Sequence, residues 1–569
     1  MKRPYSIIAG LLLSIPALAQ NNLNPTIVVT NAYEGSAADI HKPVQKMQVP
    51  DSVMKFNLDF DYSVFSNPYR GAYEFRPYLV SMKPRAEVRD ESTLYVRAGA
   101  GYALRPEAEV VWTPSIGHGF TLGVHGNLDG FIGRYRLISS RLDEQVRRYE
   151  PSGEKAPGLD LRGGVGADLT YAAGWGQAGV GLSCLNQSNR DPLLGADVRA
   201  SIFNQFGINA FARSYNLLEP GWTWQGTLDY RFGGDRLDAY HPHEHLVSLD
   251  GTFGRILADN QRVSLDAGFH LARSGDATWS TGGLVSVKPR YVLRTGRFLL
   301  DLGLLFTAHL RDNAGVTDRP ACYGTGTQVI YPAIHVRYGI LEDQLTAYAD
   351  MTGGSRLNTY SSLLEGHHFL RWNYLMLGGT PLDFSVERVR VALGLRGQVA
   401  ERLQLDLSGG YTVWGHALLE AAPYNDDELP RMGYGDYEAA FVAFTYGWKS
   451  RSILVDGSLS YRHFMMKTDR VFTPAPFSGD LRALYDWNGR IRGGIYAEFA
   501  SAREAVYDSY ANLRIPGYVD LGLGGDFRLT SRFGLWLRVG NLLNQPIQRH
   551  VLYAEDGVSV TGGITFNLR

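Results

Sequence analysis

The chain has 569 residues, a formal net charge of −1 at pH 7 and 20% charged residues. A balance this close to neutral gives no bulk attraction to nucleic acid, so a nucleic-acid partner is not expected. Aromatic residues make up 12% of the chain, and its 65 glycines exceed the usual share of about 7%. The two cysteines, Cys184 and Cys322, either pair in an oxidising compartment or remain separate thiols.

The first nineteen residues have the three parts of a secretory signal peptide. Lys2 and Arg3 carry positive charge, and an apolar run follows at 7–15. The small residues Ala17 and Ala19 flank the expected cleavage site, so residues 1–19 are predicted to be removed. No later stretch has about eighteen consecutive apolar residues, and no transmembrane helix is expected. The periplasm, the outer membrane and the cell exterior remain as destinations.

The segment 20–90 differs from the rest of the chain. It holds several prolines, and its apolar and polar residues alternate only weakly. Proline cannot donate to a sheet or continue a helix, so we predict an extended periplasmic or lumenal leader rather than a compact domain.

From Leu94 onward, apolar and polar residues alternate in segment after segment. In the last segment, Val560 and Ile564 share one face and Thr561 and Thr565 share the other, because side chains of a strand point alternately to its two sides. A tilted strand of about ten residues spans a bilayer. The pattern predicts an all-β fold over residues 91–569: a transmembrane antiparallel β-barrel of about 22 strands, with lipid outside and a polar lumen.

The connections between the predicted strands alternate in length. Short polar turns are expected at 294–297, 399–402 and 529–532, on the periplasmic side. Long loops are expected on the outer side, at 127–158, 311–327, 353–377, 417–433, 465–479 and 541–556.

The sequence Phe533 to Gln545 is FGLWLRVGNLLNQ, and Tyr553 and a closing strand follow it. This ending resembles that of TonB-dependent receptors, whose penultimate strand commonly ends on an NLxN-type motif. The segments KPR at 83–85, LYVRAGAGYALRPEAE at 94–109 and GGSRLNTY at 353–360 are similar to plug-less barrels of this kind in Gram-negative outer membranes. The resemblance implies an outer-membrane receptor or channel for a solute. The segment 20–93 is too short for the folded plug of full receptors.

The leader contains one further segment that resembles a receptor motif, the TonB box, a short extended stretch that pairs with TonB. Its residues are Thr26, Ile27, Val28, Val29 and Thr30. The alternative is an ordinary β-prone pentapeptide in an extended leader. We also predict that the leader occupies part of the lumen, since a barrel of about 22 strands is wide enough to need a closure. The competing closure is an inward-folded external loop, such as 127–158.

Several charged residues fall on the polar parity of their strands and are predicted to line the lumen. They are Arg97, Arg162, Arg388, Arg390, Arg396, Asp526 and Arg528. One interpretation is an ion-selective lumen or a solute site. The other is a set of salt bridges that fills the barrel and holds it together.

Two histidine groups have the residue types of a metal site, because imidazole and carboxylate ligands suit zinc or copper. The first is His241, His243 and His245, and the second is the pair at 367–368 beside Glu365. The alternative for both is a polar strand end or loop at the membrane rim. No resident cofactor or metal is expected.

Neither GxSxG nor HExxH occurs in the chain, so an enzyme is not expected. Two classes remain. The first is a solute receptor or channel in the outer membrane, without an energised plug, with membrane lipid around it and TonB or other envelope proteins as partners. The second is a non-enzymatic barrel subunit or scaffold of a larger outer-membrane complex, with the leader and external loops as contact surfaces.

Overall fold

The computed structural model describes residues 94–568, with gaps at 103, 118, 144–145, 195–197, 216–220, 238–239, 259, 277–278, 312–327, 342–343, 373–381, 400–401, 423–428, 430, 467–470, 509–510 and 556. The predicted signal peptide, the leader with its TonB-box-like segment, and Cys322 lie outside these residues. Everything described below belongs to the compact unit Asn67–Arg569.

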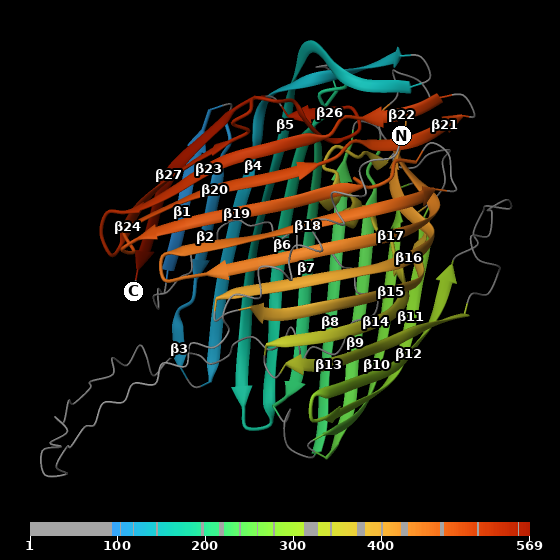
Figure 1. The fold of residues 1–569 in the computed structure, drawn as a ribbon. Helices are drawn as coiled ribbons and strands as arrows, with labels where there is room; N and C mark the ends of the chain where they lie inside the picture. Colours follow the sequence, from blue (N-terminus) through green and yellow to red (C-terminus); the bar gives the residue numbers. More distant parts are fainter. Residues whose placement is uncertain are drawn as a thin grey trace, which may run out of the picture. The chain divides into compact units, whose positions relative to one another are not determined.

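Within the described residues, 22 antiparallel strands form the wall of a closed barrel (Figure 1). The ring closes where β1 (Leu94–Gly101) pairs with β27 (Ser559–Leu568), with Leu94 opposite Leu568. The predicted fold class and strand number are confirmed. The other wall strands are β2 (Glu107–Trp112), β4 (Phe120–Asp143), β5 (Val146–Ala173), β6 (Gly176–Arg190), β7 (Ser201–Ser214), β8 (Gly221–Arg236), β9 (His243–Ala258), β10 (Gln261–Gly275), β11 (Trp279–Thr295), β12 (Phe298–Arg311), β13 (Gln328–Leu341), β14 (Leu345–Leu357), β15 (Phe384–Val399), β16 (Leu403–Ala421), β17 (Arg431–Lys449), β18 (Ile453–Met466), β19 (Phe477–Trp487), β20 (Ile491–Ala500), β23 (Tyr518–Arg528) and β24 (Phe533–Gly540).

The two faces of the wall differ as the alternation predicts. Large apolar side chains such as Leu182, Leu393 and Ile564 are more than half exposed on the outer face, which is the arrangement of a lipid-facing surface. Inward side chains of neighbouring strands form ion pairs across the lumenal face, including Arg396 with Asp406 at 2.6 Å. Such pairs bring opposite charges of neighbouring strands together on the lumenal face.

The outer end of the barrel is the end with the longer connections, since short turns are periplasmic in such barrels. The predicted loop 127–158 is wrong: β4 and β5 continue through it as a paired hairpin of 24 and 28 residues. About ten residues suffice to span the bilayer, so this hairpin extends well beyond it. The alternation fades there because neither face meets lipid, while the pairing of the two strands continues. The hairpin continues the strand pairing of the wall, and its outer residues Ile138 and Tyr149 pack with other external connections.

The outer connections pack into a hydrophobic cluster, which we call the cap. Two small hairpins contribute to it, β21 (Arg503–Asp508) with β22 (Ala511–Ile515), and β25 (Ile547–His550) with β26 (Tyr553–Glu555). β22 pairs with β5 and β26 pairs with β4, so the cap is joined to the wall hairpin. Its buried residues are Ile138, Tyr149, Ala422, Phe472, Ala505, Leu513, Ile515, Val551, Leu552 and Ala554.

No helix in the described part of the chain has the length and apolar character of a membrane span. The helix α4 (Tyr360–Gly366) is one of the connections and has a different place, described next.

Candidate functional site

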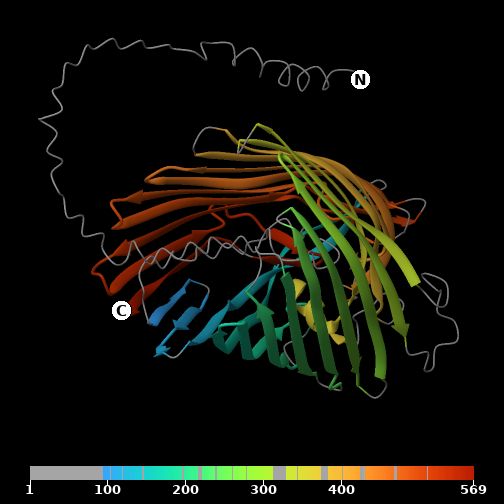
Figure 2. The ribbon, with the colours of Figure 1, turned by 90° about the horizontal axis from the view of Figure 1, so that it is seen from below.

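One connection crosses the inside of the barrel. Residues 358–372, which we call the lumenal loop, follow β14 and include α4. Eight wall strands separate β14 from β5 by the shorter way around the ring, yet the loop forms an ion pair with β5, between Glu365 and Arg162. Figure 2 shows α4, in yellow, within the ring of strands. The loop therefore spans the lumen near its outer end.

The start of α4 is fixed by local and distant acceptors. Thr359 caps the helix: its side chain accepts from the Ser362 amide, and the Ser362 hydroxyl accepts in return from the Thr359 amide, as in a capping box. Glu244, on the inward face of β9, accepts hydrogen bonds from the amides of Tyr360 at 2.6 Å and Ser361 at 3.0 Å. Amides of a first helical turn have no partner within the helix, so this buried carboxylate satisfies them.

The buried face of α4 follows helical spacing. Tyr360, Leu363 and Leu364 lie on one side and pack with Leu370, Phe203 of β7 and Met432 of β17. The Tyr360 hydroxyl donates to Asp235 of β8 at 2.6 Å, so its polar end also has a partner. Burial of each large apolar side chain contributes roughly 1.5–3 kcal/mol.

The far end of the lumenal loop is held by polar groups of β5 and β6. Gln187 donates to the Leu364 carbonyl at 3.2 Å, and Asn189 donates to the His368 carbonyl at 2.5 Å. The His368 ring lies 2.8 Å from the Asp160 carboxylate. Burial opposes a charge on His368, but the hydrogen bond and charge of Asp160 outweigh it and raise the pKa of His368.

An aromatic contact joins the lumenal loop to the cap. The ring of Phe369 stacks on Tyr553 at 4.7 Å between centroids and meets the edge of Tyr135 at 5.4 Å. The Tyr553 hydroxyl donates to Asp191, in the connection after β6, at 2.8 Å. Burial raises the pKa of this aspartate to about 6.

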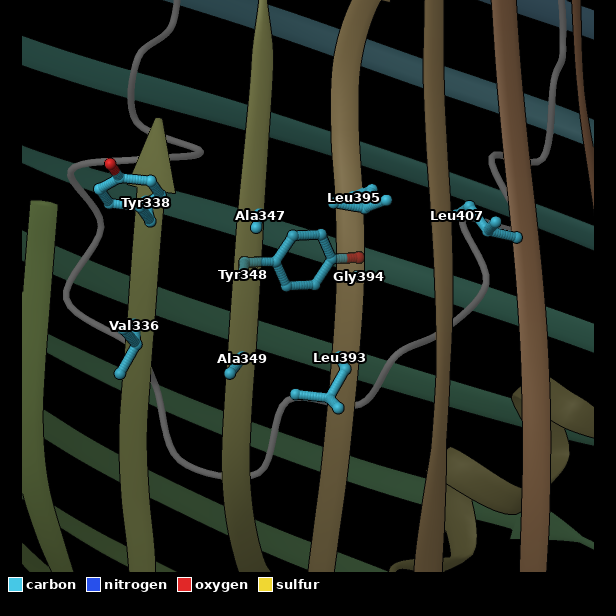
Figure 3. Close-up of a pocket in the computed structure, with 9 residues that line it drawn as sticks. All are labelled: Val336, Tyr338, Ala347, Tyr348, Ala349, Leu393, Gly394, Leu395 and Leu407. Atoms are coloured by element: carbon cyan, nitrogen blue, oxygen red, sulfur yellow. The ribbon is translucent and has the colours of Figure 1, made fainter. Parts of the chain in front are cut away.

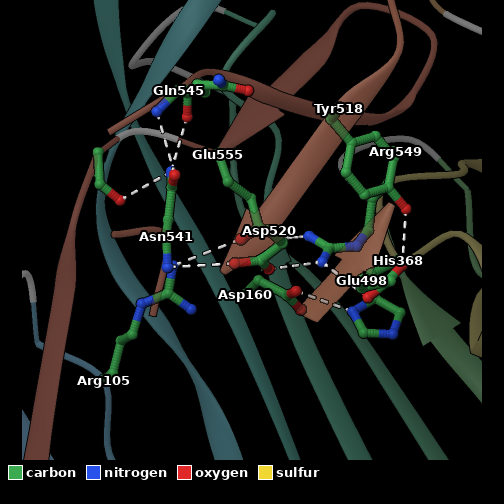
Figure 4. Close-up of polar contacts among 11 residues, drawn as sticks. Arg105, Asp160, His368, Glu498, Tyr518, Asp520, Asn541, Gln545, Arg549 and Glu555 are labelled. Carbon is green, nitrogen blue, oxygen red and sulfur yellow. Dashed lines mark hydrogen bonds and ion pairs between the residues drawn. The ribbon is translucent and has the colours of Figure 1, made fainter. Parts of the chain in front are cut away.

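The C-terminal NLLN motif shapes the chain that leads into the cap. Asn541 and Asn544 both adopt positive φ, 48° and 53°, a conformation that asparagine tolerates better than most residues. The Asn541 side chain donates to the carbonyls of Gln545 at 2.6 Å and Gly557 at 3.1 Å and accepts from the Gln545 amide (Figure 4). The role of the motif here is therefore to fix a turn.

A charged cluster lies beside this turn. Arg549 of β25 contacts three carboxylates, Glu498 at 3.2 Å, Asp520 at 2.9 Å and Glu555 at 3.1 Å (Figure 4). Its guanidinium also lies over the ring of Tyr518, which donates to Glu498. Burial disfavours the charge, but the surrounding carboxylates outweigh it and raise the pKa of Arg549. The cluster ties the last external connection to the tops of β20 and β23.

The residues predicted to line the lumen lie in several environments. Arg97 is buried on the inward face, 3.7 Å from Asp526 and over the ring of Trp536. Arg162 contacts the lumenal loop, and Arg396 is paired with Asp406 on the next strand.

The remaining three lumenal candidates are placed differently. Arg390 lies over the ring of Phe441. Arg388 is exposed, as the additional residue of a bulge between Glu387 and Val389. Arg528 is exposed at the end of β23 next to the turn. The bulge interrupts the parity on which the sequence prediction relied.

The first predicted histidine group does not converge. His241 is exposed in the connection before β9, His243 stacks on Phe232, and the His245 ring lies 3.0 Å from the Tyr230 hydroxyl. Strand alternation turns Glu244 the other way, toward α4. Among the described residues, the histidine and acidic side chains with metal-ligand spacing are instead His367, Glu420 and His550. Their positions in the sequence share no local pattern.

A groove of about 500 Å³ lies on the wall over β13 to β16 (Figure 3). Its lining includes the outward apolar side chains of Tyr338, Leu393, Leu395 and Leu407, separated by small alanines. Tyr348 belongs to the other face, since its hydroxyl donates to Asp406. Because the groove opens on the lipid-facing surface, a lipid acyl chain fits it better than a water-soluble solute.

The closed barrel, its lipid-facing band and its internal loop define a class of fold: a transmembrane β-barrel of the outer-membrane type. No protein-family model matches the sequence, and no curated protein matches it.

Comparison with solved structures supports the same fold. The copper transporter OprC has 12% sequence identity and a TM-score of 0.61, over 84% of this chain and 80% of that one. The ferric enterobactin receptor PfeA from Pseudomonas aeruginosa has 12% identity and a TM-score of 0.60, over 84% and 80%. The FrpB iron transporter from Neisseria meningitidis has 10% identity and a TM-score of 0.62, over 84% and 82%. The resemblance to TonB-dependent receptors is therefore confirmed for the barrel fold.

Proposed function

We propose that this protein is an outer-membrane solute receptor or channel whose lumen is closed from the outer side by the lumenal loop, without an energised plug. The observation that carries the proposal is the set of contacts between this loop and β5 and β9, two wall strands that do not border the loop in the sequence. These include Arg162 with Glu365, Asp160 with His368 and Glu244 with the start of α4.

The nature of these contacts suits a closure that opens. A typical hydrogen bond contributes about 0.5–1.5 kcal/mol net, because water replaces the lost partner when the groups separate. The loop is thus held by many small contributions rather than by a covalent link. A solute that binds the open form better than the closed form shifts this equilibrium.

The structural neighbours suggest which solutes to test first. The three neighbours named above are a copper transporter, a ferric enterobactin receptor and an iron transporter. We therefore take copper ions and ferric complexes as the first solutes. TonB is the first protein partner to test, through the segment 26–30, and the proposed function as a channel does not depend on it.

Conductance of the purified full-length barrel in planar bilayers tests the proposal. We compare the wild type with a variant in which residues 359–372 are replaced by a short Gly-Ser linker, and with a deletion of residues 21–49 in the leader. Frequent large openings in the linker variant, with the leader deletion unchanged, support closure by the lumenal loop. Large openings only in the leader deletion assign the closure to the leader and contradict the proposal.

The alternative, a barrel subunit of a larger complex, predicts a different result. In that case all three proteins remain silent in bilayers, and solubilised membranes yield stoichiometric partner proteins with the wild type. That combination overturns the channel proposal.

A further inference from the structure

Three side chains from separate connections meet between the lumenal loop and the cap. His367 comes from the lumenal loop, Glu420 from the outer end of β16 and His550 from the end of β25. Nδ1 of His550 lies 2.8 Å from Oε1 of Glu420, and Nε2 of His367 lies 3.6 Å from the same oxygen. One ligand atom of each residue lies within 4.8 Å of the other two.

The ring of His367 is buried and lacks hydrogen-bond partners within the described part of the chain, which is unusual for a histidine. Its side chain is 5% exposed, and neither ring nitrogen has a hydrogen-bond partner among the residues that the structure describes. A buried polar group without a partner costs roughly 1–3 kcal/mol, so such a nitrogen needs a physical reason.

The spacing matches a tetrahedral ion. Zinc binds histidine nitrogen at about 2.0–2.1 Å and carboxylate oxygen at about 2.0–2.2 Å, so neighbouring ligand atoms lie about 3.3–3.5 Å apart. The two distances from Glu420 Oε1 fall on either side of that value. Two histidines and one glutamate form a known zinc ligand set, and water completes the four positions.

The surroundings orient the carboxylate. Arg503 of β21 donates to Oε2 of Glu420 at 2.5 Å, which turns Oε1 toward the two imidazoles. Partners of this kind fix the geometry of metal ligands. His550 is 34% exposed, so an ion can reach the group from its side.

We propose that His367, Glu420 and His550 bind a divalent transition-metal ion of the zinc type, and that the ion fastens the lumenal loop to the cap. The ion belongs to the closure and is not the transported solute. Each ligand lies on a different segment, so the bound ion links the lumenal loop, β16 and the last external connection. The inference goes beyond the proposed function, because the site exists whichever solute the barrel carries.

Binding is tested on the full-length protein without a histidine tag, in detergent, after treatment with a chelator. Zn²⁺ is titrated by calorimetry, and Co²⁺ is added to a parallel sample to record its visible absorption, which reports coordination geometry. We expect one tight equivalent and a tetrahedral Co²⁺ spectrum. In H550Q and H367Q the affinity should fall by more than about 100-fold, since loss of a neighbouring support alone costs 10–100-fold.

Two variants serve as controls. H368Q changes the adjacent histidine, which contacts Asp160 instead, and H243A removes an exposed histidine on the wall. Both should retain the tight equivalent. If H367Q does not insert correctly, H550Q alone decides whether the site binds the ion, because the side chain of His550 is partly exposed. Absence of a saturable equivalent in the wild type, or full binding in the H367Q/H550Q double variant, overturns the site.

A separate experiment tests whether the bound ion holds the lumenal loop in place. Arg371 lies in the lumenal loop and is 7% exposed, so trypsin cleaves after it only when the loop moves. We expect cleavage of the wild type to be at least about 10-fold slower with Zn²⁺ than with chelator, and H550Q to show no such difference. Equal cleavage of metal-loaded and metal-free wild type overturns the fastening role. This test is independent of conductance, so its failure leaves the proposed function standing.

Discussion

Substitution of Glu244 by alanine should release the start of the lumenal loop. The Glu244 side chain is buried and accepts from the amides of Tyr360 and Ser361. Alanine leaves both amides without that acceptor, at roughly 1–3 kcal/mol each, and entry of water into the vacated space recovers part of the loss. We therefore expect the docked state of the loop to lose about 2–4 kcal/mol, a shift of about 30- to 700-fold in its opening equilibrium.

Hydrogen exchange followed by mass spectrometry measures this shift. In the docked loop, the amide of Leu363 donates to the Thr359 carbonyl, and the amide of His367 donates to the Leu363 carbonyl. Exchange of such amides tracks the equilibrium population of the locally open form. A peptide covering residues 359–372 should exchange faster in E244A by the factor given above.

Two variants control this measurement. E244Q retains one acceptor oxygen and should fall between the wild type and E244A. H243A removes the neighbouring side chain on the opposite face of β9 and should exchange like the wild type. If E244A is correctly inserted and exchanges within about threefold of the wild type, Glu244 does not hold the loop and the reasoning is refuted.

Three further predictions concern the wall and the cap. Arginine in place of Leu182, which is 56% exposed toward lipid, should lower the free energy of unfolding by about 2–4 kcal/mol, measured with denaturant in lipid vesicles. Arginine in place of the neighbouring inward residue Ser183 should lower it far less, and equal losses would contradict the assigned faces. Asn541→Ala removes three side-chain hydrogen bonds and places alanine at a positive φ, so the midpoint temperature of thermal unfolding should fall clearly. Asn541→Gly should have an intermediate midpoint, because glycine adopts a positive φ without strain. An unchanged midpoint in Asn541→Ala would contradict this role of Asn541. Burial raises the pKa of Asp191 from its ordinary value of 3.8 to about 6, so the folded protein binds this proton more tightly than the unfolded chain. The stabilisation from this proton should be fully present below about pH 4 and be lost as the pH rises through about 6. Asp191→Asn should remove that pH dependence from unfolding midpoints measured between about pH 4 and 8.

The wall could be predicted from the sequence because each strand carries its own evidence. Lipid on one side and a polar lumen on the other impose a period of two, as in Val560 to Ile564, and this signal needs no distant partner. The same logic located the short turns at 294–297 and 529–532, between β11 and β12 and between β23 and β24. It failed for 127–158, because strands beyond the membrane no longer meet lipid.

The closure could not be predicted in this way. Loop residues such as His367 find their partners across the lumen, and Glu420 and His550 lie 130 residues apart in the sequence. Nothing in the local pattern marks such meetings. The histidine-rich segment at the start of β9 was a misleading signal for a metal site. The alternation there was informative: it predicts that Glu244 and its two flanking histidines point to opposite faces, as they do.

The cap joins segments of the barrel that are far apart in the sequence. Asp191 and Tyr553, whose side chains form a hydrogen bond, are 362 residues apart in the sequence. Contacts between such distant residues form late, because the entropy of closing a long loop must be paid before they stabilise anything. A chain that has inserted most of its strands but not yet its last hairpin therefore lacks the partner on which Phe369 stacks. The contact between the lumenal loop and the cap is therefore complete only when the C-terminal segment is in place.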